Sequence, residues 1–507
     1  WNKMGKVDPE WNVPGSLPEW EGCVVDRARS MFERDKNHPS ILFWSCGNES
    51  YAGSCIRAMA RFFRSRDDSR LVHYEGVFQN RAFDDSSDVE SRMYATPADI
   101  RAYLTGPHTK PMLLCEYMHD MGNSLGGMEE YIRLQEEFPQ YQGGFIWDFK
   151  DQALWHTDPL GRRVLGYGGD FGDRTSDYNF SANGILFADG REKPAMQEVR
   201  YWYANEAVRA ARDEANARAR QEAERMLHAR RRAAAMQAGA APGLRIVRGD
   251  GNLGVYGENF SALFSYGAGG PVSLRYGGVE WLWRAPRPAV WRAPTENDVG
   301  CGFPQRSAVW RGADQYARCV GWEILQAEAD CASIRYRFSL PGAPQAEAEI
   351  CYTVDRLGEV QVRAAYRGAP GLPELPCFGV RFSTPAPVDR VDWLGLSGET
   401  YPDRCKGGVF GLHSETPAPA GYLVPQEYGC HLDTMRATLH RQAVSLADVG
   451  ALELVMEHEA FAFSALPHTP AQLEDAWHQE ELPPSTRTVV SVYGAMRGVG
   501  GIDSWGA

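Results

Sequence analysis

Two short segments decide the fold of this chain: ILFWSCGNES at residues 41–50 and MLLCEYMH at residues 112–119. Each is an apolar run of strand length that ends on a carboxylate, Glu49 in the first segment and Glu116 in the second. A (β/α)8 barrel places its functional groups at the C-terminal ends of buried parallel strands. The two segments therefore predict that both carboxylates open onto the same face of a barrel.

The sequence around these segments alternates between strand-like and helix-like stretches. Apolar runs predict strands at residues 41–46, 71–74, 92–95, 112–115 and 144–147. Helical spacing of apolar residues predicts helices at residues 16–36, 56–64, 97–104, 128–138 and 193–203. This alternation favours parallel βαβ units. Because a closed barrel of this type needs eight strands, we expect the chain to carry strands 4–8, with the first three strand–helix units upstream.

The remaining sequence changes character twice. Residues 155–192 are rich in Gly, Asp and Asn and predict a long structured loop. Residues 206–238 are rich in Ala and Arg, with eight Arg against five acidic residues. Charge patterning favours a solvated helix there, and a basic arm that binds nucleic acid is the alternative. From about residue 244, apolar and polar residues alternate between recurring Pro-Gly turns, which predicts a β-sandwich.

These patterns predict a multidomain chain of α/β and all-β parts. We expect a partial (β/α)8 TIM barrel at residues 1–204, a helical linker at 205–242 and a large β-sandwich at 243–507.

The composition is that of a globular protein with more acidic than basic residues. The net charge of −13 comes from 53 basic and 66 acidic residues, which argues against nucleic acid as the main partner. No apolar run approaches the ~18 residues of a membrane span. The 11 cysteines contain no CxxC pair, which favours reduced thiols in a cytoplasmic protein. No signal peptide is visible in a sequence that begins at Trp1.

Two carboxylates on one barrel face are the groups that glycoside hydrolysis needs. In a retaining glycosidase one carboxylate attacks the sugar, while a carboxylic acid about 5–5.5 Å away protonates the leaving oxygen. Ionisation of one group raises the pKa of the other, so one of them can stay protonated near neutral pH. The alternative is a structural role, in which Glu49 or Glu116 caps a helix or forms an ion pair.

Further motifs follow one another along the chain. They are NHPS at 37–40, GNES at 47–50, CEYMHDMGNS at 115–124, QGGFIWD at 142–148, YGGDFGD at 167–173, ND at 297–298, YPDR at 401–404 and GGIDSW at 500–505. In this order they resemble glycoside hydrolase family 2 and, within it, the large bacterial β-galactosidases. The resemblance covers about residues 15–203 and 244–507, and it implies a galactose-mutarotase-like small-chain domain for the C-terminal part.

The resemblance implies a role for each matching residue. Glu116 would be the nucleophile that forms the covalent galactosyl intermediate, and Glu49 would be the general acid and then the base. Asn48 would hydrogen-bond the sugar 2-OH, and Tyr94 would hydrogen-bond the nucleophile, although a lone Tyr in a strand is also typical of a core. Substrate contacts are implied for four further residues: His119, Trp147, Asn183 and Trp505.

The resemblance also implies two cations. Mg²⁺ would bind through Glu49, and Na⁺ through the Phe180 carbonyl and the Asn183 side chain. Oxygen ligands suit both ions. The other ligands of the family pattern would lie upstream.

The sequence departs from the family pattern in two respects. The N-terminal domains and the first barrel strands do not occur in it. The family also places a sandwich domain between the barrel and the C-terminal domain, where this chain has the Ala/Arg-rich stretch 206–238.

We therefore predict a retaining β-galactosidase that cleaves β-galactosides such as lactose by double displacement. A homo-oligomer is expected from the family. Two alternatives stay open: a related β-glucuronidase or β-mannosidase, and a carbohydrate-binding fragment without catalysis, since a catalytic pair needs a rigid scaffold.

Overall fold

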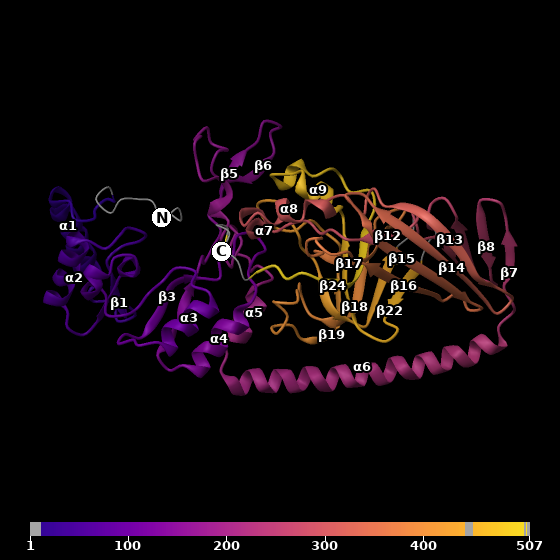
Figure 1. The fold of residues 1–507 in the computed structure, drawn as a ribbon, viewed down its shortest axis with the longest axis horizontal. Helices are drawn as coiled ribbons and strands as arrows, with labels where there is room; N and C mark the ends of the chain where they lie inside the picture. Colours follow the sequence, from indigo (N-terminus) through magenta and orange to yellow (C-terminus); the bar gives the residue numbers. More distant parts are fainter. Residues whose placement is uncertain (1–11, 442–449, 501–502, 504–507) are drawn as a thin grey trace. The chain divides into compact units, whose positions relative to one another are not determined.

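The computed structural model describes residues 12–441, 450–500 and 503. This part of the chain divides into two compact units. The first unit comprises the residues up to 119 together with 127–148, and the second comprises 120–126 together with the residues from 149 onward. In Figure 1 the first unit holds the indigo and purple helices, and the second holds the orange and yellow sheets.

The first unit is built from helices that alternate with parallel strands. Its elements are α1 (Pro18–Asp35), β1 (Phe43–Ser45), α2 (Ser54–Arg66), β2 (Leu71–His73), α3 (Pro97–Thr105), β3 (Met112–Tyr117), α4 (Met128–Glu137) and β4 (Tyr141–Ile146). β1 pairs in parallel with β2, and β3 pairs in parallel with β4. This arrangement confirms the α/β character predicted for the N-terminal part.

The local sequence explains why these elements form. Trp44 in β1 is fully buried and stacks on Phe63 of α2, with ring centroids 5.4 Å apart. At the start of α3, the Thr96 and Asp99 side chains cap each other's backbone N–H groups, and Pro97 occupies the first turn. Local caps and a shared apolar face therefore fix the helices against the strands.

One predicted strand of the first unit is wrong. Residues 92–95 form no strand, and Met93 makes only an isolated parallel bridge to Glu116. The reason lies in Tyr94, whose φ of 49° is left-handed and interrupts an extended backbone.

The second unit begins with a hairpin where a long loop was predicted. β5 (Leu154–Thr157) pairs antiparallel with β6 (Arg163–Gly166). Asp158 closes the turn because its carboxylate accepts the backbone N–H groups of Leu160 and Arg162. The loop prediction for 155–192 is therefore wrong at its N-terminal end. The predicted helix at 193–203 forms as α5 (Met196–Trp202).

The remainder of the second unit is mostly β-structure, as predicted. Its strands are β7 (Arg245–Arg248), β8 (Asn252–Tyr256), β9 (Phe260–Ser265), β10 (Gly270–Tyr276), β11 (Val279–Glu280), β12 (Arg287–Ala289), β13 (Arg318–Ala327), β14 (Cys331–Leu340), β15 (Ala343–Asp355), β16 (Val360–Arg367), β17 (Cys377–Ser383), β18 (Arg390–Leu396), β19 (Phe410–Glu415), β20 (His431–Thr434), β21 (Arg436–Arg441), β22 (Gly450–Val455), β23 (Phe461–Leu466) and β24 (Val489–Met496). Short helices α7 (Glu296–Gly300), α8 (Phe303–Arg306) and α9 (Pro470–Glu474) connect some of them.

Within the described residues these strands form four larger antiparallel sheets. Their orders are β11-β10-β9-β8-β7, β13-β14-β15-β16, β12-β17-β24-β23-β20 and β19-β18-β21-β22. The first two sheets share one core, in which the inward residues Ile334, Tyr336 and Phe338 of β14 are buried. The last two sheets share a second core around Trp393 and Phe463. Alternating burial along β14 is the period-2 pattern that its sequence predicts.

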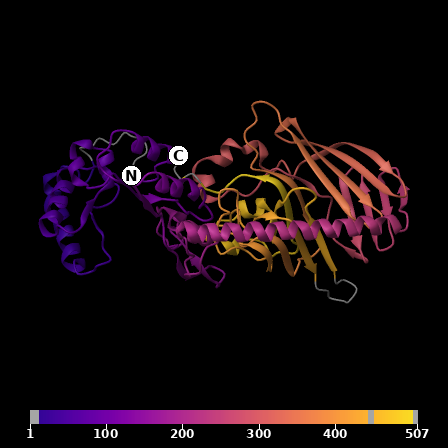
Figure 2. The same cartoon turned by 90° about the horizontal axis from the view of Figure 1, so that it is seen from below.

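The helix predicted at 206–238 forms as α6 (Glu206–Ala240), but it is not solvated on every side. Its Ala223 and Leu227 are buried in a cluster with Phe410, Met435 and Met456. Figure 1 shows α6 running beneath β18 and β19, and Figure 2 shows it from below, crossing the strands. The helix packs along the sheet β19-β18-β21-β22, so its apolar stripe, though narrow, is a packing surface.

Polar contacts extend this packing along α6. The Asn216 amide donates to the Gly408 carbonyl at 2.9 Å and accepts the Phe410 N–H at 2.9 Å. Arg220 pairs with Asp433, and Arg230 pairs with Glu453. Several of the Arg residues that suggested a solvated helix thus bind the β-region.

Among the described residues, each helix is too short or too polar to cross a bilayer. The expected cytoplasmic location stays a prediction.

Candidate active site

Glu116 lies near the C-terminal end of β3 and is 8% exposed. The Tyr94 phenol donates a hydrogen bond to Glu116 Oε2 at 2.7 Å. The Tyr94 backbone N–H donates to the Glu116 carbonyl at 2.9 Å. Tyr94 therefore contacts Glu116 through both its backbone and its side chain.

The surroundings of Glu116 disfavour its charged form. Burial raises the pKa of this carboxyl to about 7, and the charges of Glu49, Glu75 and Asp148 act in the same direction. The Tyr94 hydrogen bond opposes them, because it stabilises the carboxylate. Because the charge of Glu49 raises the pKa of Glu116, the two predicted carboxylates interact electrostatically within the first unit.

Glu49 lies four residues after the end of β1. Its φ of 60° is left-handed, which is uncommon for a residue other than Gly. Its backbone N–H donates to Glu75 Oε1 at 2.6 Å. Glu49 itself is half-buried, and the preceding Asn48 is exposed.

Two further predicted residues belong to the first unit. The buried His119 packs edge-on against Tyr94, with ring centroids 5.5 Å apart. Trp147 follows β4, is exposed, and donates its backbone N–H to the Tyr117 carbonyl at 3.1 Å. The first unit thus brings Tyr94, Glu116 and His119 into contact, and the charge of Glu49 acts on the same carboxyl.

Sequence reasoning missed a third carboxylate in this group. Glu75 follows β2 and is 6% exposed, and its charge acts on Glu116. The sequence pattern could have indicated it, because Glu75 directly follows the predicted strand 71–74, as the other two acids follow theirs. Ligand atoms of Glu75, His73 and Cys115 lie within 4.8 Å of one another.

That group is better explained by hydrogen bonding than by a metal. His73 Nδ1 contacts Ser45 Oγ at 3.0 Å, and its Nε2 contacts Ser91 Oγ at 2.7 Å. Burial lowers the pKa of His73 to about 4, so the ring is neutral. Both ring nitrogens already have partners, so His73 links β2 to Ser45 of β1 and to Ser91, which lies outside the strands.

The residues predicted to hold Na⁺ belong to the second unit. The buried Asn183 donates its side-chain N–H to the Phe180 carbonyl. Among the described residues, Asn183 Oδ1 is a buried oxygen without a hydrogen-bond partner. A carbonyl oxygen and an orphaned amide oxygen so close in sequence fit the ligand chemistry of a hard cation. Trp505 lies outside the described residues.

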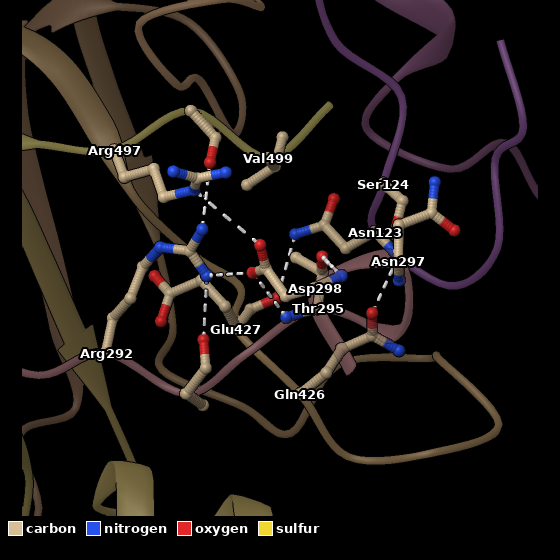
Figure 3. Close-up of polar contacts among 12 residues, drawn as sticks. Asn123, Ser124, Arg292, Thr295, Asn297, Asp298, Gln426, Glu427, Arg497 and Val499 are labelled. Carbon is tan, nitrogen blue, oxygen red and sulfur yellow. Dashed lines mark hydrogen bonds and ion pairs between the residues drawn. The ribbon is translucent and has the colours of Figure 1, made fainter. Parts of the chain in front are cut away.

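The segment 120–126, directly after His119, is buried by polar contacts in the second unit. Asn123 Nδ2 donates to Glu399 Oε1 at 2.6 Å and to the Glu427 carbonyl at 2.8 Å. Its backbone N–H donates to Gln426 Oε1 at 2.8 Å. Figure 3 shows this segment beside the buried Arg292–Asp298 ion pair. The CEYMHDMGNS motif therefore supplies residues to both compact units.

Parallel strand–helix units that end on coupled carboxylates are typical of barrel enzymes that cleave glycosidic bonds. Comparison with protein families agrees with this class. Residues 1–208 match the model described as "Glycosyl hydrolases family 2, TIM barrel domain". Residues 256–507 match "Beta galactosidase small chain". The chain belongs to glycoside hydrolase family 2, with a TIM-barrel portion followed by a mostly β region.

Curated relatives extend this result. The chain is 39% identical over 586 aligned residues to the "Beta-galactosidase" of Halalkalibacterium halodurans, covering 100% of this chain and 57% of that protein. It is 37% identical to the Streptococcus thermophilus "Beta-galactosidase", covering 100% of this chain and 58% of that protein. The "Beta-galactosidase large subunit" of Latilactobacillus sakei is 63% identical over 205 residues, which are 40% of this chain and 33% of that protein. The chain thus spans little more than half the length of the first two relatives.

Proposed function

We propose that this chain carries the catalytic carboxylates of a retaining β-galactosidase, with Glu116 as nucleophile and Glu49 as acid and base. The observation that carries the proposal is the Glu116 site. The buried Glu116 carboxylate accepts a hydrogen bond from Tyr94, and the charge of Glu49 raises its pKa. The relatives named β-galactosidase support the galactoside substrate.

The proposed chemistry uses the two carboxyls in different roles. While both carboxyls are ionised, the charge of Glu49 contributes to raising the pKa of Glu116. When Glu49 is protonated that contribution disappears, so Glu116 ionises more readily. Glu116 then attacks the anomeric carbon as Glu49 protonates the leaving oxygen. In the second step Glu49 takes a proton from water, which displaces the sugar from Glu116.

Other residues would bind and orient the sugar. Asn48 would hydrogen-bond the 2-OH, a contact that strengthens in the transition state. Tyr94 would hold Glu116 in its ionised form. Substrate contacts are proposed for four residues: His119, Trp147, Asn183 and Trp505.

Two cations belong to the same proposal. Glu49 would hold Mg²⁺, and the Phe180 carbonyl and Asn183 would hold Na⁺. When bound, they supply positive charge near the acid/base group and a fixed site for a sugar hydroxyl. The proton donor and the nucleophile would both be side chains of the protein, Glu49 and Glu116, and not the cations.

The finer architecture is also proposed. The parallel strands would be strands 4–8 of an eight-stranded barrel within residues 1–204, followed by α6 in the 205–242 segment. The facing sheets of 243–507 would form one large β-sandwich. A homo-oligomer stays a family expectation.

The test is hydrolysis of p-nitrophenyl β-galactoside by this chain with Mg²⁺ present, beside the Glu116→Gln variant. We expect turnover that the variant lacks, and faster turnover than with the matching β-glucuronide and β-mannoside. Faster cleavage of either of those sugars would change the substrate assignment. Sugar binding without turnover would favour a carbohydrate-binding fragment, and unchanged turnover by the Glu116→Gln variant would remove the nucleophile assignment.

A further inference from the structure

The segment 74–76 holds the backbone around Glu49 from several sides. Glu75 accepts the Glu49 N–H at 2.6 Å. The Tyr74 hydroxyl contacts Ser50 Oγ at 2.5 Å and also hydrogen-bonds the Ser50 carbonyl. A Cβ atom at Gly76 would lie 2.2 Å from the Ser50 carbonyl oxygen, so only glycine permits this approach. Three consecutive residues thus cradle residues 49 and 50.

Glu49 needs such support because of its backbone conformation. A left-handed φ on a residue other than Gly persists only where the surroundings stabilise it. The Glu75 carboxylate is buried, and burial is the main reason that its pKa is raised. Burying a carboxyl is unfavourable unless it makes compensating hydrogen bonds, and the Glu49 N–H provides one of them.

We propose that Glu75 is a positioning residue, which fixes the direction of the Glu49 side chain by holding its backbone N–H. The inference rests on the proposed role of Glu49 as acid and base. Glu75 acts through Glu49 and does not itself transfer a proton. The carboxylates that face this site are Glu49, Glu116 and Asp148, and Glu75 adds a further negative charge to them.

The direct test is hydrogen exchange at the Glu49 amide in the full 507-residue chain. Glu75→Leu removes the acceptor, whereas Glu75→Gln keeps an acceptor oxygen at nearly the same place. We expect exchange in Glu75→Leu to be faster by roughly ten-fold or more, as the loss of a hydrogen bond to a charged group predicts, and close to wild type in Glu75→Gln. If Glu75→Leu fails to fold, Glu75→Asp withdraws the acceptor by one methylene and should behave in the same way. Equal exchange in the wild type and the acceptor-removing variant would overturn the proposal.

The functional test compares two substrates whose leaving groups differ in their need for a proton. A poor leaving group such as phenol depends on protonation by Glu49, whereas 2,4-dinitrophenol leaves without it. General acid catalysis contributes about 10²–10⁴-fold, so we expect kcat/KM of Glu75→Leu on phenyl β-galactoside to fall by at least ~10-fold. On 2,4-dinitrophenyl β-galactoside it should fall by less than ~3-fold, because this leaving group needs no proton from Glu49. Removal of the Glu75 charge also favours the ionised form of Glu116. An equal fall on both substrates would indicate a merely structural role.

The two tests separate this inference from the proposed function. If the wild type does not cleave galactosides, the proposed function fails, while hydrogen exchange still decides whether Glu75 holds Glu49. If turnover is present but exchange does not change, only the role of Glu75 is lost.

Discussion

Replacing Leu227 of α6 by alanine tests whether this helix is packed or solvated. Leu227 is 5% exposed, whereas its neighbour Met226 is 65% exposed on the same helix. Leu227→Ala should therefore weaken the docking of α6, and Met226→Ala should not. Both variants keep a residue of high helix propensity, so neither changes the helix itself by more than a few tenths of a kcal/mol.

The magnitude follows from the atoms removed. Leu227→Ala deletes three buried carbons, and at about 0.8 kcal/mol each the transfer contribution is about 2.4 kcal/mol. A cavity would add to this, since buried Leu→Ala changes cost about 2–5 kcal/mol. Met435 and Met456 line the cluster, and their flexible side chains can partly fill the space. We therefore expect a loss of about 2–3 kcal/mol, which is roughly a 30- to 150-fold change in an opening equilibrium.

Hydrogen exchange of peptides from 220–232 measures that opening directly. In Leu227→Ala these amides should exchange faster by the factor given above, whereas Met226→Ala should resemble the wild type. Peptides from α2 in the first unit serve as an internal control and should not change. If the two variants behave alike, α6 is not held by its apolar stripe, and the packing argument is wrong.

Two further predictions concern titration. Tyr94→Phe removes the hydrogen bond that favours ionised Glu116, so the pKa of this carboxyl should rise above about 7. The acid limb of the pH profile of kcat/KM should then move up by about one to two pH units, since a hydrogen bond to a charged group contributes about 1.5–3 kcal/mol. An unmoved limb would contradict the role of Tyr94. His478 is partly buried, which disfavours its charged form, but hydrogen bonds to Asp170 and Glu481 raise its pKa overall. This stabilisation is complete below the ordinary histidine pKa and is lost as pH rises through the raised value. His478→Gln should therefore lower the melting temperature at pH 6, by no more than about 1 °C in a chain of this size, and have little effect at pH 9. An equal effect at both pH values would contradict this assignment.

The parallel part of the fold could be predicted because its signals are local. The apolar runs at 41–46 and 112–115 were long enough to mark strands, and β1 and β3 lie on them. Glu49 and Glu116 were found because each lies close to the C-terminal end of such a run, Glu49 four residues after β1 and Glu116 next to the last residue of β3. Tyr94 was expected in a strand, but its left-handed backbone depends on contacts with Glu116 that the local sequence does not show.

Long-range packing could not be predicted in the same way. The stretch 206–238 has few apolar residues larger than Ala, so its pattern alone favours a solvated helix. The surface that covers Leu227 comes from Phe410, Met435 and Met456, about 200 residues further along the chain. Likewise, the partners of Asn123 lie some 300 residues away, so only the folded chain explains why this asparagine is buried.

Several residues of the first unit have a left-handed backbone conformation, and this affects how a mutational survey of the protein should be interpreted. Glu49, Tyr94 and Met118 all have positive φ, a region where β-branched residues are the most strained. A valine at these positions would strain the backbone as well as remove the native side chain. Any loss of activity in such a variant would therefore overstate the chemical role of the native side chain. Glu116 is not among the residues with positive φ. Glu116→Gln therefore changes the side chain without added backbone strain, and any change in its activity can be assigned to the carboxyl group itself.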